Sequence, residues 1–257
     1  DRRFTYEEVQ KIIEDKAGNH AAEILKLNSL AYKLREQKFK NGAISFETTE
    51  VKFKLDEKGK PVGVYVKERK DAHKLIEDFM LLANRKVAEF FSKKGKGKHK
   101  YTFVCRVHDA PNPETLGTFA QFAARFGYKI NTKSDKEIAR SLNFLMEDVE
   151  GKKEQNVLTH LAIRSMAKAI YTTKGTSHYG LAFDHYTHFT SPIRRYPDVM
   201  VHRLLFHYLN GGESVNAEHY EKMCQHSSQM EKKAADAERA SIKYKQAEYL
   251  KDQVGTV

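Results

Sequence analysis

The sequence predicts an α+β fold that is mainly helical and carries a small antiparallel sheet. Three observations lead to this prediction. Apolar residues recur at helical spacing along most of the chain, a spacing of two is confined to residues 43–66, and strands and helices do not alternate regularly. We therefore expect helices to form most of the core.

Two helices are predicted before residue 42. Thr5 and Glu8 have the spacing of a capping box, with Thr5 as the N-cap, and apolar residues follow at helical spacing. A longer helix is expected from Ala21 to Phe39, and it should end at Asn41-Gly42.

Period-two alternation then predicts the sheet. Its apolar positions are Ile44, Phe46, Val51, Phe53, Leu55, Val62, Val64 and Val66. The segment 57–61 contains Gly59 and Pro61 and should form a turn between the later strands. We expect these strands to pair antiparallel.

Helical spacing resumes over residues 72–91, where apolar side chains cover most of the circumference. This helix is expected to be mostly buried at the centre of the core. After a strand over 101–107, further helices are predicted over 112–127, 136–148 and 157–170. A long, highly charged helix over 217–250 has a narrow apolar stripe, which suits a helix at a domain edge that leads elsewhere.

Composition narrows the range of partners. The chain has 45 Lys and Arg against 34 Asp and Glu, a net charge of +11, which favours a polyanionic partner but equally fits a basic protein without one. Cys105 and Cys224 have no zinc or disulfide spacing, so a reducing, cytoplasmic setting is expected. No apolar run is long enough for a membrane span. We expect that both ends are cuts, since the chain starts without Met and stops in a strand-like segment.

The segment 185–198 predicts a loop followed by a helix, with Ser191 as N-cap and Pro192 at the first helical position. Arg194 and Arg195 would then lie in the first turn, where cations oppose the helix dipole at a cost of up to about 1 kcal/mol. A bound phosphate would explain them, because backbone N–H groups and guanidinium groups together bind anions. The alternative is that Asp198 simply neutralises them in a structural ion pair.

The same segment resembles a known signature. Tyr186-x-His188-Phe189-Thr190-Ser191-Pro192-Ile193-Arg194-Arg195-Tyr196-x-Asp198, followed by His202-Arg203, is similar to the RNB catalytic domain of ribonuclease II, ribonuclease R and the exosome-associated nucleases. Residues 3–9, 42–46, 72–84 and 106–108 agree in order, so the resemblance spans essentially the whole chain. The sequence of residues 188–198 is more similar to bacterial ribonuclease R than to ribonuclease II.

The resemblance implies a processive 3′-to-5′ exoribonuclease that releases nucleoside 5′-monophosphates from single-stranded RNA. It implies that Arg194 neutralises the scissile phosphate, that Phe46 stacks on a base, and that Arg195 also contacts RNA. Tyr6 and Glu77 would engage the terminal ribose, and Glu238 would be a further carboxylate near the site. Each of these residues could instead have a purely structural role. Phe46 could be a core residue, Tyr6 could pack at a helix start, and Glu77 could be a buried carboxylate with a structural partner.

One feature of the family is missing from the sequence. The family holds Mg²⁺ with closely spaced aspartates, and no such run occurs here, so we expect the Mg²⁺ ligands to lie outside this chain and the chain alone to be inactive. The resemblance implies that residues 1–209 are the C-terminal portion of the RNB catalytic domain. Residues 210–257 would be a long helix leading to a truncated oligonucleotide-binding barrel.

Two other functions remain open at this point. A hydrolase could use a metal held by His178, His185, His188 and His202 with Asp184 or Asp198. Alternatively, the chain could be an RNA-binding module without chemistry. In each case we expect no membrane association, no obligate protein partner and a monomer.

Overall fold

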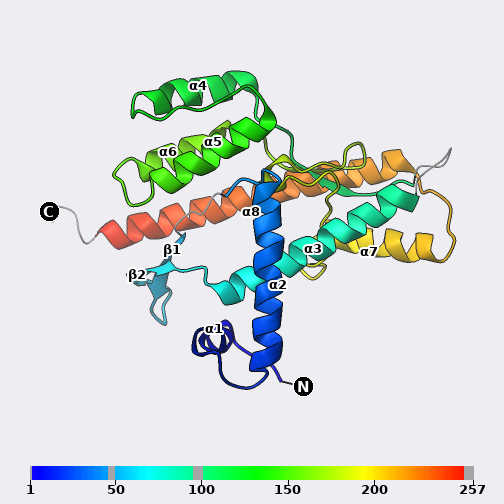
Figure 1. Cartoon of the computed structure of the whole chain (residues 1–257), viewed down its shortest axis with the longest axis horizontal. Helices are drawn as coiled ribbons and strands as arrows, with labels where there is room; N and C mark the ends of the chain where they lie inside the picture. The colour runs from blue at the N-terminus through cyan, green and yellow to red at the C-terminus, as the bar shows by residue number, and fades with distance from the viewer. Residues whose placement is uncertain (1, 46–49, 95–100, 252–257) are drawn as a thin grey trace. The chain divides into compact units, whose positions relative to one another are not determined.

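The computed structural model describes residues 2–45, 50–94 and 101–251. Its elements are α1 Tyr6–Asp15, α2 Ala21–Lys40, β1 Glu50–Leu55, β2 Pro61–Lys67, α3 Asp71–Lys94, β3 Cys105–Val107, α4 Pro113–Ala124, α5 Asp135–Asp148, α6 Gln155–Ser165, β4 Ile170–Thr172, a short 3₁₀ turn Tyr179–Leu181, α7 Tyr196–Leu209 and α8 Ala217–Lys251 (Figure 1). The predicted α+β class, mainly helical with a small antiparallel sheet, is confirmed.

The chain divides into two compact units. The first contains residues 1–46 and 70–225, and the second contains residues 47–69 and 226–257. The second unit therefore combines the β1–β2 hairpin with the later part of α8. No described helix is both long and apolar enough to cross a membrane.

The first helices begin where the sequence predicts. Thr5 caps α1, because its hydroxyl accepts from the N–H of Glu8 while the Glu8 carboxylate accepts from the N–H of Thr5. Helix α2 crosses α3 (Figure 1), and the two are tied by Arg35, whose guanidinium lies 2.8 Å from the buried Asp78 carboxylate. Burial raises the pKa of Asp78, although the hydrogen bond from Arg35 opposes this.

Helix α3 is less enclosed than predicted. Ala72, Leu75, Ala88 and Phe91 are buried, but Ile76 is 44% exposed. The apolar residues do encircle the helix, yet its neighbours cover only part of that surface. The prediction of a mostly buried helix was therefore wrong for the side that carries Ile76.

One core forms where the C-terminal half of α3 meets β3, β4, α7 and the first turns of α8. Phe91 stacks on Phe103 with 3.8 Å between ring centroids. The buried residues of this core are Ala88, Phe91, Phe103, Val104, Cys105, Val107, Tyr171, Met200, Val201, Leu204, Tyr208 and Cys224.

A second core lies among α4, α5 and α6, which lie side by side in Figure 1. Its buried residues are Leu116, Phe119, Ala123, Ile138, Leu142, Leu145, Val149, Leu158 and Ala162. Asn112 caps α4 and Ser134 caps α5 through their side-chain oxygens. Both predicted helix starts are confirmed to within a residue.

The C-terminal end predicted for α6 was wrong. The helix stops at Ser165, and its C-cap Met166 is already extended. Ala167 then accepts a hydrogen bond from the His108 ring, and Ile170–Thr172 pairs antiparallel with β3. The predicted strand over 101–107 is correspondingly shorter, at Cys105–Val107. Both differences arise because pairing across more than sixty residues overrides the local apolar pattern.

The predicted hairpin is confirmed in the second unit, where β1 and β2 pair antiparallel with Val51 opposite Val66 and Phe53 opposite Val64. The start of the predicted alternation is different. Residues 43–45 are not a strand, because their backbone polar groups bond elsewhere in the first unit: Asn143 binds Ala43 and Ser45, and Ile44 donates to Gly180.

Candidate nucleic-acid interface

The motif segment turns before it becomes a helix. Helix α7 begins at Tyr196 with Arg195 as its N-cap, so the predicted start at Pro192 was wrong. The N–H groups of Arg194 and Arg195 both donate to the Ser191 carbonyl, which closes a tight turn over residues 191–195. Arg194 therefore precedes the helix, and the dipole penalty expected for it does not apply.

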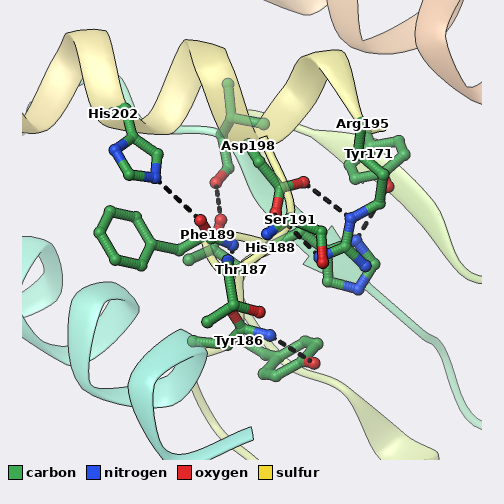
Figure 2. A network of polar contacts seen from close by, with 12 residues as sticks. Tyr171, Tyr186, Thr187, His188, Phe189, Ser191, Arg195, Asp198 and His202 are labelled. Atoms are coloured by element: carbon green, nitrogen blue, oxygen red, sulfur yellow. Dashed lines mark hydrogen bonds and ion pairs between the residues drawn. The ribbon is translucent and has the colours of Figure 1, made fainter. Parts of the chain in front are cut away.

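Asp198 holds this turn against the helix. Its side chain is fully buried and accepts from the N–H of Ser191 at 2.7 Å, from Arg195 Nε at 2.9 Å and from Arg195 Nη2 at 2.8 Å (Figure 2). A bidentate, charge-assisted pair of this kind has a defined geometry. The structural ion pair considered for this motif is therefore formed by Arg195.

Arg194 has a different environment. Its side chain is exposed, and its guanidinium makes no hydrogen bond or ion pair with any residue in the described ranges. The neighbouring Ile193 is fully exposed as well. The turn thus presents Arg194 at its tip while Arg195 and Asp198 anchor its base.

Helix α3 fixes the residues that lead into the turn. The N–H groups of Phe189 and Thr190 donate to Asn84 Oδ1 at 2.9 and 3.2 Å. The same side chain donates from Nδ2 to the hydroxyl of Tyr186 at 3.2 Å. Asn84 is only 3% exposed, so one buried amide ties three points of the motif to α3.

Strands β3 and β4 hold the other side of the segment. The Thr187 hydroxyl donates to the Val104 carbonyl at 2.7 Å, and the N–H of Arg106 donates to the Tyr186 carbonyl at 3.0 Å. The Tyr171 hydroxyl lies 2.8 Å from His188 Nδ1 (Figure 2). These contacts leave the backbone of residues 186–188 little freedom.

His202 on α7 completes the support. Its ring stacks on Phe189 with 4.0 Å between centroids, and its Nε2 donates to the Phe189 carbonyl at 2.9 Å. Phe189 is therefore held by Asn84 through its N–H and by His202 through its carbonyl. The contacts with Asn84 and His202 therefore restrain the backbone of the segment that precedes Arg194.

Desolvation favours the neutral form of two half-buried histidines, His188 and His178. Burial lowers the pKa of His188 to about 2, and the positive charges of Arg195 and Arg106 act in the same direction. Burial also lowers the pKa of His178 to about 3. A neutral imidazole has one ring nitrogen that can accept a hydrogen bond, and the Tyr171 hydroxyl can either donate to His188 Nδ1 or accept from it.

Two other predicted site residues are brought near each other. The Tyr6 ring stacks on His73 of α3 at 4.2 Å, with an interplanar angle of 15°. Glu77 is half-buried and follows His73 by four residues, so the two lie on the same side of α3. Asn84 follows Glu77 by seven residues, again on that side and about 10 Å along the helix axis.

Two predicted residues cannot be placed against Arg194. Phe46 lies outside the described residues, although Asn143 holds Ala43 and Ser45 just before it. Glu238 is exposed on α8 and belongs to the second unit. The sequence reasoning missed Asn84 and Asn143, for which the available signal was a single asparagine within each apolar helical pattern.

The described residues do not fit a metal centre. Within the described ranges, no group of three or more His, Cys, Asp or Glu side chains is arranged to hold a metal ion. Asp198 already binds Arg195 and Ser191, and His202 binds the Phe189 carbonyl. The histidine site considered as an alternative is therefore not supported by these side chains.

Comparisons with known proteins agree with the motif. The RNB domain family matches residues 1–211. Ribonuclease R of Chlamydia trachomatis is 38% identical over 97% of this chain and 35% of its own length. Ribonuclease R 1 of Lactococcus lactis is 37% identical over 98% of this chain and 32% of its own length.

Solved structures show the same fold. Mycoplasma genitalium RNase R in complex with ribose-methylated single-stranded RNA superposes with a TM-score of 0.85 at 26% identity, covering 99% of this chain and 41% of that one. Yeast Ssd1, described as a pseudonuclease, shares the fold with a TM-score of 0.63 at 18% identity, covering 87% of this chain and 27% of that one. The chain spans about a third of the length of the curated relatives it matches. The chain belongs to the RNB domain family.

Proposed function

We propose that this chain is the RNA-gripping part of a ribonuclease R-type exoribonuclease, which degrades single-stranded RNA from the 3′ end and releases nucleoside 5′-monophosphates. The observation that carries the proposal is Arg194, an exposed guanidinium at the tip of a turn that buried polar contacts hold rigid. We also propose that the enzyme is monomeric and cytoplasmic and that its substrate is single-stranded RNA.

The two arginines would have separate tasks. Arg194 donates to the non-bridging oxygens of the scissile phosphate, where negative charge builds up as the bond is cleaved. Arg195 is paired with Asp198 and positions the turn, although its remaining N–H groups could still reach RNA. A preorganised cation is effective here because it needs no rearrangement during the reaction.

The other predicted residues would recognise the end of the RNA. Tyr6, stacked on His73, and Glu77, on the same side of α3, would contact the terminal ribose. Phe46 would stack on a base, and Glu238 would add a carboxylate near the reaction. These assignments follow the motif resemblance, and the positions of Tyr6 and Glu77 beside His73 support the first two.

Hydrolysis would need Mg²⁺, and its ligands would come from a part of the enzyme that this sequence does not include. We therefore expect the 257-residue chain to bind RNA without cleaving it. A longer protein that contains this chain and an aspartate-rich segment is expected to cleave.

Binding of a labelled single-stranded RNA tests the role of Arg194. Arg194→Ala is expected to weaken binding about tenfold, which corresponds to about 1.4 kcal/mol for a lost charge-assisted contact. The matched control is Arg164→Ala, which removes an exposed arginine of α6 and should leave binding unchanged. Equal affinity of wild type and Arg194→Ala would contradict the proposal.

A cleavage assay with Mg²⁺ tests the chemistry. The longer protein should release nucleoside 5′-monophosphates from the 3′ end, and its Arg194→Ala variant should bind Mg²⁺ normally but lose most of this activity. A longer protein that binds RNA and never cleaves it would favour the alternative of a binding module. Cleavage by the 257-residue chain alone would show that its metal ligands had been misjudged.

A further inference from the structure

We propose that a groove between α2 and α5, separate from the Arg194 turn, is a second contact site for single-stranded RNA. The groove has a volume of about 670 Å³, within the usual range for ligand sites. Its lining residues belong to the first unit and are Glu36, Phe39, Lys40, Gly42, Lys136, Arg140, Asn143, Phe144 and Glu147. We refer to it below as the α2–α5 groove.

The α5 wall of the groove departs from ordinary amphipathic patterning. Ile138, Leu142 and Leu145 on one side of α5 are buried in the second core. The other side carries Lys136, Arg140 and Phe144 at four-residue spacing, and Phe144 is 67% exposed. A helix that only covered a core would have polar residues there, so the exposed aromatic ring needs another explanation.

The α2 wall repeats the same chemistry. Phe39 is 37% exposed and is followed by Lys40, and Lys38 Nζ lies over its ring at 5.0 Å from the centroid, so a base would stack on the other face. Among the described residues, Lys40, Lys136 and Arg140 form no ion pair, so their charges face solvent. Two carboxylates, Glu36 and Glu147, also line the groove and leave an excess of one positive charge.

Exposed aromatic rings among unpaired cations suit single-stranded nucleic acid. Bases stack on such rings with about 1 to 3 kcal/mol per base, and Lys and Arg neutralise the phosphates between them. A duplex would keep its bases stacked inside and could not use Phe39 and Phe144 in this way. A purely apolar partner would leave the excess positive charge of the groove without a counter-charge.

The groove is connected to the segment that leads to Phe46. Asn143 lines the groove and also donates to the Ala43 carbonyl at 2.8 Å and accepts from the N–H of Ser45 at 2.9 Å. RNA in the groove would therefore lie beside the backbone that precedes the predicted stacking residue. This proposal rests on the proposed function only for the polarity of the RNA, whose 3′ end would lie at the Arg194 turn. Binding of RNA in the groove requires neither Arg194 nor cleavage.

Binding of labelled polyuridine by the 257-residue chain tests the groove. Phe144→Ala should weaken binding about tenfold, consistent with the loss of one base stack. The matched control is Phe206→Ala, which removes a ring that is 74% exposed on α7 and lies outside the groove lining. Because both rings are exposed, thermal unfolding should be nearly unchanged, which separates lost contacts from lost folding.

Charge variants of the groove should change RNA affinity in opposite directions. Arg140→Gln should weaken binding, while Glu147→Gln should strengthen it, because the groove then carries more positive charge. Ultraviolet crosslinking of RNA that contains 4-thiouridine should place crosslinks on α5 in the wild type and not in Phe144→Ala.

The two proposals fail in different ways. If Arg194→Ala weakens binding while Phe144→Ala and Arg140→Gln leave it unchanged, the groove inference is overturned and the proposed function stands. If the groove variants lose affinity and Arg194→Ala does not, the groove is an RNA site and the Arg194 assignment is wrong. Unchanged affinity in Phe144→Ala overturns the groove inference even if another part of a longer protein packs there.

Discussion

Asp198 shows how a single buried charge shapes the motif. Its carboxylate accepts one backbone and two guanidinium hydrogen bonds, which hold Arg195 inward while Arg194 stays at the exposed tip. Two adjacent arginines of identical chemistry are thus separated into an anchor and a free cation. Local residue patterns alone do not distinguish the two arginines, because the difference depends on which side of the turn faces α7.

Removal of this carboxylate should be costly. Asp198→Ala leaves the Arg195 guanidinium partly buried without a counter-charge, and we expect a loss of about 3 to 5 kcal/mol in the free energy of unfolding. Urea denaturation measures this loss. Asp148→Ala is the matched control, because its exposed pair with Lys152 should contribute no more than about 1 kcal/mol. Similar losses for the two variants would mean that the buried pair has no special weight.

His188 makes the stability dependent on pH. Burial lowers its pKa in the folded state to about 2, while in the unfolded chain the pKa should be near 6.5. Between these values the unfolded state binds more protons, so the contribution of His188 is complete above about pH 6.5 and is lost progressively as the pH falls below it. His178, with a pKa of about 3, acts in the same direction.

His188→Gln should therefore reduce the acid sensitivity. We expect the urea midpoint of the wild type to fall more between about pH 7 and about pH 5 than that of the variant, even if the variant is less stable at neutral pH. His160→Gln replaces an exposed histidine and should keep the pH dependence of the wild type. A variant with unchanged acid sensitivity would show that His188 is not buried as a neutral ring.

Among the elements, α3 links the predicted parts of the site. One side of the helix carries His73 beneath Tyr6, then Glu77, then Asn84, which holds the motif backbone. Apolar periodicity predicted the position of this helix well, because it is a local property. The role of Asn84 was not predictable, since its partners Tyr186, Phe189 and Thr190 lie more than a hundred residues further along the chain.

Helix boundaries were predicted correctly where a capping side chain marks them, and wrongly at the end of α6 and the start of α7. Capping side chains define the starts of α1, α4 and α5 in the structure, and the starts predicted for these helices lie within a residue of them. The end of α6 and the start of α7 depend on strand pairing with β3 and on the bond from Ser191 to Asp198. Neither interaction follows from apolar periodicity or from the spacing of capping residues.

Asn84→Ala should affect both folding and binding. It leaves the N–H groups of Phe189 and Thr190 without their acceptor, which should lower the free energy of unfolding by about 1 to 3 kcal/mol. RNA affinity should also fall, because the turn that presents Arg194 loses its support on α3. The measurements are urea denaturation and RNA binding under conditions where the variant stays folded.

Asn28→Ala is the control for this variant. Asn28 is a similarly buried asparagine on α2, and its Oδ1 has no hydrogen-bond partner among the described residues. Its replacement should destabilise less and leave RNA affinity unchanged. If both variants reduced RNA binding equally, the effect of Asn84 would reflect general loosening and not the positioning of the motif.

For the whole molecule, membership of the RNB domain family establishes the fold but does not by itself establish an activity of this chain. A relative about three times as long is 37% identical over 98% of this chain, and a yeast protein described as a pseudonuclease shares the fold. A shared fold does not by itself establish an activity. What this chain offers is a net charge of +11 and two candidate places for RNA, the Arg194 turn and the α2–α5 groove.

Salt dependence can separate these local contacts from the general effect of a net charge of +11. Each phosphate neutralised on single-stranded RNA contributes about −0.7 to the slope of log affinity against log salt concentration. If Arg194, Lys40, Lys136 and Arg140 are the main contacts, the slope should be near −3, and Arg194→Ala should make it shallower by about 0.7. Phe144→Ala should weaken binding at every salt concentration with no change of slope, because stacking releases no counterions. A slope that Arg164→Ala reduces as much as Arg194→Ala would instead show that the charge acts diffusely.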